Sequence, residues 1–124
     1  MTDDNVEYEE TAELISSSKV EGTAVYNEDG EKLGTIQSFM VDKRTGQADY
    51  AVLSFGGFFG LGADHYPIPW DMLDYSEEQG GYVVDIDKDT LEDAPRYGAS
   101  EQPTYDSAYR ERIDQHYGLE YPAV

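Results

Sequence analysis

The chain has 124 residues, which predicts a single domain with a modest hydrophobic core. Hydrophobic residues make up 39% of it and aromatic residues 13%, too many for a fully disordered chain, and no apolar run approaches bilayer length. Twenty-seven acidic residues against eight basic ones give a net charge of −19, and a field of that sign repels nucleic-acid phosphates and anionic lipids. We therefore expect no nucleic-acid partner and no membrane insertion.

The distribution of charge and aromatic residues predicts three regions. Residues 1–18 carry six acidic residues and no basic one, and we interpret them as a flexible arm in which Leu14 and Ile15 are able to dock on the domain. Residues 19–97 hold nearly all the β-type patterning and are predicted to form the folded domain. Residues 98–124 form a tyrosine-rich extension.

Two further features of composition bear on the compartment. The N-terminus is acidic and lacks the basic-then-apolar order of a signal peptide. The chain has no cysteine, so neither disulfides nor thiolate chemistry is expected. We expect a cytoplasmic protein, and the scarcity of lysine leaves open a salt-adapted host.

Strand patterns recur at short intervals through the central region. The expected strands cover residues 20–27, 33–42, 49–55, 66–70, 73–76 and 82–86. Glycines stand in the turns between them, where they adopt positive φ without strain, and Gly34 marks a bulge or sharp bend in the second strand. Five or six short antiparallel strands with tight turns predict a mainly β protein, a small barrel whose closure hides its strand edges.

A short helix is predicted after the last strand. Asp89 and Glu92 stand three residues apart, as in a capping box, and Pro95 ends the helix after about one turn. His65 is interpreted as a strand-face residue and His116 as a residue at the C-terminus of a second helix, where the helix dipole favours it.

The second helix is predicted over residues 105–117, with Thr104 as its N-cap and Gly118 as its stop. An aromatic stripe recurs every four residues along it: Tyr105, Tyr109, Ile113 and Tyr117. This stripe either packs on the chain's own barrel or covers a partner or a second copy, and the sequence leaves both open.

Five motifs between residues 30 and 97 form a recognisable set. They are G-E-K-L-G-T-I at 30–36, V-D-K-R-T-G at 41–46, Y-A-V-L-S-F-G-G at 50–57, H-Y-P-I-P-W at 65–70 and L-E-D-A-P-R-Y at 91–97. Together they resemble the PRC-barrel family over residues 19–97. The resemblance implies a PRC-type β-barrel and a scaffold that docks to larger assemblies, as in the H subunit of purple-bacterial photosynthetic reaction centres and in a ribosome maturation factor. It implies no catalytic set and no cofactor.

Three chemical alternatives can be tested against the residues. The glycine-rich stretch 57–62 is followed by Ala63 and Asp64, not by the Lys and Ser/Thr of a phosphate-binding loop. Alternating carboxylates at 85–89 are typical of a calcium loop, but Thr90 and Arg96 stand where an EF-hand needs glycine and glutamate. The two histidines have no cysteine partner for zinc. We therefore expect no enzyme and no metal cofactor.

The sequence favours a protein-binding scaffold whose partner it does not name, with a homodimer as one possibility. The predicted partner contacts lie in the glycine-aromatic loop and in the tyrosine stripe: Phe58, Phe59, Leu61, Tyr105, Tyr109 and Tyr117. Two alternatives stay open, an acidic structural or stress protein and a sensor that binds a small ligand or cation at the barrel mouth.

Overall fold

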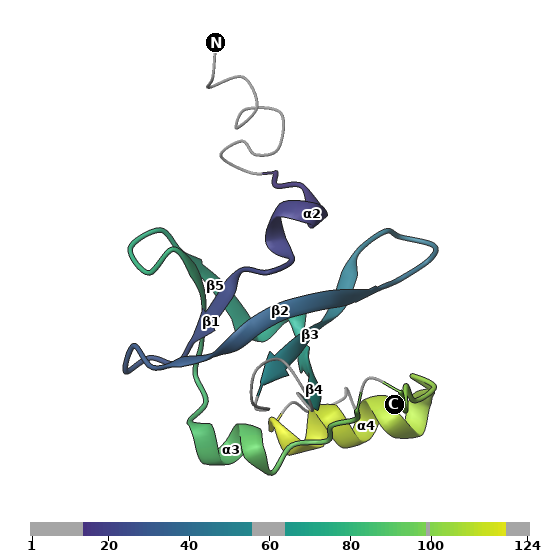
Figure 1. The fold of residues 1–124 in the computed structure, drawn as a ribbon. Coiled ribbons are helices and arrows are strands. Elements are labelled where there is room, and N and C mark those ends of the chain that lie inside the picture. The colour runs from purple at the N-terminus through teal and green to yellow at the C-terminus, as the bar shows by residue number, and fades with distance from the viewer. Residues whose placement is uncertain (1–13, 56–63, 99, 119–124) are drawn as a thin grey trace.

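The computed structural model describes residues 14–55, 64–98 and 100–118, which contain a six-stranded sheet curled into a half-barrel (Figure 1). The strands are β1 (Ala24–Tyr26), β2 (Lys32–Val41), β3 (Ala48–Phe55), β4 (Asp64–Pro69), β5 (Leu73–Ser76) and β6 (Gly81–Val84). Their order across the sheet is β4-β3-β2-β1-β6-β5. The prediction of a mainly β, barrel-like fold is confirmed. The sheet is mixed, however, because β1 and β6 pair in parallel while the other neighbours are antiparallel.

A short corner between the outer strands forces the sheet to curl. Only the 3-10 turn η1 (Trp70–Met72) separates β4 from β5. Four peptide links from Pro69 to Leu73 reach at most about 14 Å, whereas six strands lying flat hold their outer members about 24 Å apart. The indole of Trp70 fills this corner, with its ring centroid 5.4 Å from Phe39 and 5.5 Å from Tyr82.

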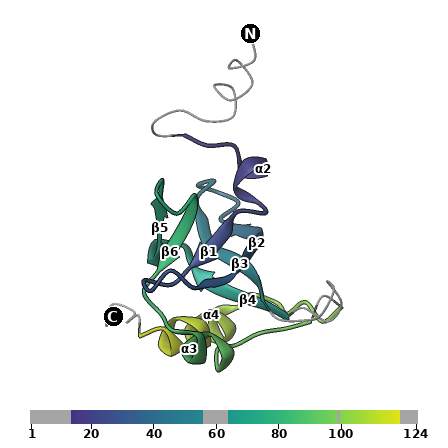
Figure 2. The same cartoon turned by 60° about the vertical axis from the view of Figure 1, so that its left-hand side comes forward.

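The β3 strand is buried on both of its faces. Ala51 and Leu53 belong to the core inside the curl, together with Ile36 and Ile68. The intervening Tyr50 and Val52 are buried on the outer face, which α4 (Ser107–His116) covers. Figures 1 and 2 show α3 (Lys88–Glu92) and α4 beneath the sheet, and α2 (Ser17–Val20) at the opposite end of the half-barrel.

The first strand is shorter than predicted, because residues 17–20 form the helix α2 and the chain then turns at Gly22 (φ 84°). The predicted bulge in β2 is confirmed beside Gly34. Val25 of β1 pairs with Gly34 and Tyr26 pairs with Lys32, so Leu33 is skipped. A side chain at position 34 would clash with the Ser54 carbonyl oxygen, which explains why glycine stands there.

The helix caps differ from those predicted. Asp87, not Asp89, caps α3, because its carboxylate accepts from the Thr90 amide at 2.7 Å. Asp106, not Thr104, caps α4 by accepting from the Tyr109 amide at 3.0 Å. An N-cap residue needs an extended backbone and an acceptor that reaches the amide three residues on, and both aspartates meet that condition. The C-terminal stop at Gly118 (φ 76°) is as predicted.

Candidate functional site

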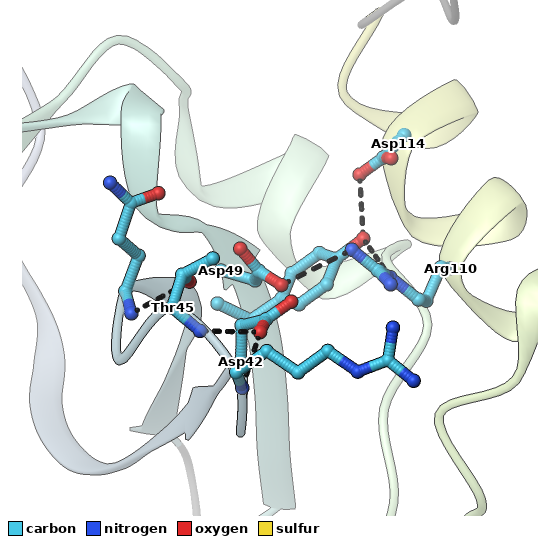
Figure 3. A network of polar contacts seen from close by, with 8 residues as sticks. Asp42, Thr45, Asp49, Arg110 and Asp114 are labelled. Carbon is cyan, nitrogen blue, oxygen red and sulfur yellow. Dashed lines mark hydrogen bonds and ion pairs between the residues drawn. The ribbon is translucent and has the colours of Figure 1, made fainter.

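A polar network fastens α4 to the outer face of β3 (Figure 3). The Tyr50 hydroxyl donates to the Asp114 carboxylate at 3.1 Å. The Arg110 guanidinium lies 3.4 Å from the Asp49 carboxylate and 5.5 Å from the centre of the Tyr50 ring. Neighbouring residues of the strand thus engage residues one turn apart on the helix, which fixes how α4 lies on the sheet.

The same view shows the β2–β3 turn, which closes on the Asp42 side chain (Figure 3). The Asp42 carboxylate accepts from the backbone amides of Arg44 at 2.8 Å and Thr45 at 3.0 Å. These bonds, with Thr45 the larger contribution, hold the pKa of Asp42 below its ordinary value. Gly46 completes the turn with a φ of 77°, so the hairpin has a defined shape.

The tyrosine stripe lies against the chain's own domain. The Tyr105 ring packs 5.9 Å from Tyr50 and 5.1 Å from Tyr109, and its hydroxyl lies 3.0 Å from that of Tyr97. Burial and then the hydrogen bond with Tyr97 raise the pKa of Tyr105. Tyr117 packs against the hydrophobic core. The stripe therefore makes intramolecular contacts, and a further role for these tyrosines in binding a partner stays a prediction.

Within the part of the chain that the structure describes, two hydroxyl groups of the stripe are buried without a hydrogen-bond partner, those of Tyr109 and Tyr117. Burial raises the pKa of Tyr109 to about 12 and that of Tyr117 further above its ordinary value. Both groups are held in the neutral form, which is the form that a site of low polarity favours.

The other three predicted contacts, Phe58, Phe59 and Leu61, lie outside the described residues. The two histidines lie in separate places. His65 is on β4, where its backbone pairs with Tyr97, and the His116 Nε2 lies 2.7 Å from the Thr90 carbonyl oxygen. In the part of the chain that the structure describes, no three histidine or carboxylate side chains are arranged to hold a metal ion.

An apolar groove of about 200 Å³ opens at the other end of the half-barrel, between α2 and the β2–β3 hairpin. Among the described residues, no charged side chain lines it, and the lining residues are Ile15, Ser17, Val20, Phe39, Val41, Gly46, Ala48 and Trp70. Two apolar side chains at this groove are open to solvent: Leu14, next to Ile15, is 73% exposed and Val41 is 51% exposed. We call this groove and the exposed side chains beside it the apolar end of the half-barrel.

Sequence reasoning identified only the Leu14-Ile15 pair at this end. The groove combines residues from the first helix, the hairpin and the η1 corner, and no local pattern brings these segments together. One signal was present, however. Met40 and Val41 are consecutive apolar residues at the end of an alternating strand, where one of the two must face water unless something covers it.

A comparison with known families identifies this fold. The sequence model of the PRC-barrel domain matches residues 12–91. The chain belongs to the PRC-barrel family. The PRC-barrel match includes all six strands and ends within α3, so α4 lies beyond it.

One relative of this PRC-barrel chain is an uncharacterized protein of Deinococcus radiodurans, 29% identical over 80 residues. The matched part is 64% of this chain and 28% of the relative, so the chain spans well under half of that protein's length. Among the described residues, the helices are too short and too polar for any to cross a membrane.

Proposed function

We propose that this PRC-barrel domain is a non-catalytic module that binds another protein chain through the apolar end of the half-barrel. The observation that supports it is the groove lined by Ile15, Phe39 and Trp70, with Leu14 and Val41 exposed beside it. In a chain with a net charge of −19, a connected apolar surface without lining charges is the feature that solubility alone does not explain.

The groove is suited to binding a partner by burying apolar surface and not to catalysing a reaction. Among the described residues, its lining offers mainly aliphatic and aromatic carbon, with the Ser17 hydroxyl and the Trp70 indole N–H as its polar groups. Such a surface gains roughly 25 cal/mol for each Å² of apolar area removed from water, and an aromatic-lined pocket is the usual seat of an interface anchor. None of the described lining side chains can exchange a proton near neutral pH, which favours a docking surface over an active site.

Site-specific photo-crosslinking in living cells tests this proposal. A photoreactive amino acid at position 41 is expected to capture one protein species, which mass spectrometry then identifies. Position 75 is the matched control, because Tyr75 is 49% exposed, close to the 51% of Val41, but lies on β5. Equal capture at both positions, or no capture at position 41, would contradict the proposed function.

A further inference from the structure

We propose that the chain bound at the apolar end is a second copy of this protein, in a two-fold dimer in which Leu14 of each copy enters the groove of the other. This inference rests on the proposed function, since it names the partner of the same surface.

The groove and a side chain able to fill a partner's groove lie next to each other. Ile15 lines the groove, and the side chain of the adjacent Leu14 is 73% exposed. A two-fold interface requires that each copy present both the projecting part and the receiving part on one surface. Cavities of about 150 Å³ accommodate benzene, so a groove of about 200 Å³ is large enough for a leucine side chain.

The charges around the groove are also self-complementary. On the hairpin side, Lys43 and Arg44 are exposed, and within the described residues neither forms an ion pair. On the opposite side, Glu21 follows α2 and Asp71 follows Trp70, and both are exposed, whereas the basic Lys19 of α2 is half-buried. A two-fold rotation brings the hairpin side of one copy towards the helix side of the other, so bases meet acids around an apolar centre.

The net charge restricts where two copies can meet. Two chains of −19 repel each other over most of their surfaces. Among the described residues the groove lining carries no charge, and Lys43 and Arg44 of the β2–β3 turn stand at its border, where they offset part of this repulsion. An acidic segment of a different protein could also contact Lys43 and Arg44. The experiments below distinguish such a partner from a second copy of this chain.

Sedimentation of the purified full chain over a range of concentrations is the first test, and a dimer is the expected result. Leu14→Ala removes two buried leucine side chains per dimer and is expected to raise the dissociation constant about a hundredfold. Leu14→Asp and Val41→Asp are expected to give monomers. Tyr75→Asp adds the same charge at a similarly exposed position on β5 and is expected to leave the dimer intact.

Covalent trapping is the second test, and it does not depend on whether an aspartate variant folds. The chain has no cysteine, so introduced thiols report only on each other. An equal mixture of Leu14→Cys and Ala48→Cys copies is expected to form a disulfide-linked heterodimer under mild oxidation, whereas Leu14→Cys mixed with Tyr75→Cys is not.

Several results would overturn this inference. They are a monomer at every concentration, a dimer that persists in Leu14→Asp, and absence of the 14–48 disulfide. If the purified chain is monomeric while position 41 captures a different protein in cells, the proposed function stands and the dimer is wrong. If position 41 captures only this chain, both the proposed function and the dimer stand.

Discussion

Glu28, in the β1–β2 turn, faces Asp85, which follows β6. The charge of Asp85 is the main reason why the pKa of Glu28 is raised above its ordinary value of 4.5. A carboxyl group whose pKa is raised on folding adds stability below its unfolded pKa and loses it as the pH rises through the folded pKa. At neutral pH the repulsion between the two carboxylates destabilises the folded state.

Replacing Glu28 with glutamine is therefore expected to raise the melting temperature at pH 7, because the repulsion with Asp85 disappears. The increase should vanish below pH 4.5, where Glu28 is itself protonated, and should shrink as salt is added. Thermal unfolding followed by circular dichroism measures it. Glu77→Gln, in the β5–β6 turn, controls for the general effect of removing one of 27 acidic residues. An equal increase in both variants would contradict a specific Glu28–Asp85 repulsion.

At the scale of elements, α4 is held on the sheet by a few specific contacts. Ile113 is its one fully buried residue, and the remaining contacts are polar or aromatic, including Tyr50 with Asp114 and Arg110 with Asp49. The pKa values of Tyr105, Tyr109 and Tyr117 are all raised, chiefly by burial. Each therefore stabilises the docked helix below the ordinary tyrosine pKa of 10 and loses that contribution as the pH rises through its folded pKa.

We expect α4 to leave the sheet between pH 10 and 12, the upper limit being the pKa of Tyr109. The near-ultraviolet absorbance of tyrosinate should then rise together with the loss of amide protection in α4. Tyr109→Phe removes a buried hydroxyl that has no hydrogen-bond partner among the described residues and should shift this release to higher pH without lowering stability at pH 7. Tyr75→Phe, at an exposed ring, is the control. Ionisation of the stripe near pH 10 with α4 still protected would contradict the assignment.

Local patterns in the sequence were sufficient to place the strands and turns. The alternation of apolar and polar residues and the glycines in the turns predicted the bounds of five strands closely. The apolar run from Tyr50 to Leu53 matches the burial of β3 on both faces. The start of α4 was misplaced because Thr104 and Asp106 are both good capping residues, and only the backbone geometry decides between them.

Long-range contacts could not be predicted in the same way. The parallel pairing of β1 with β6 and the groove at the apolar end each join segments far apart in sequence. The amino acids of β1 do not indicate whether the second strand that pairs with it runs parallel or antiparallel. The predicted contacts therefore lie in two local motifs, the glycine-aromatic loop and the tyrosine stripe, whereas the groove depends on Trp70 and Phe39 meeting at the corner of the curled sheet.

At the scale of the whole molecule, unbalanced negative charge dominates the electrostatics. Three ion pairs are present in the described residues, and all involve partly exposed side chains, so each contributes little. The repulsion among 27 acidic and only eight basic residues is the larger effect. Salt screens both, because the Debye length falls from about 10 Å at 0.1 M to about 3 Å at 1 M.

The free energy of unfolding is therefore expected to rise with the concentration of sodium chloride and to level off at about 1 M, where screening is nearly complete. Urea denaturation at a series of salt concentrations measures this, since urea carries no charge of its own. A fall in stability with salt would show that the ion pairs outweigh the repulsion. A rise that continues well beyond 1 M would instead favour the acidic structural or stress protein considered from the sequence.

The parallel ladder between β1 and β6 also sets the order in which the domain can be assembled. It joins Val25 to Tyr82, more than fifty positions apart, whereas β2 and β3 pair through a short turn. Pairing across so long a loop carries a larger entropic cost than closing a hairpin, so it follows the hairpins in time. On the ribosome, β1 has only β2 as a neighbour until β6 has emerged. During that interval one edge of β1 is open, and the nascent chain is most exposed to wrong pairing.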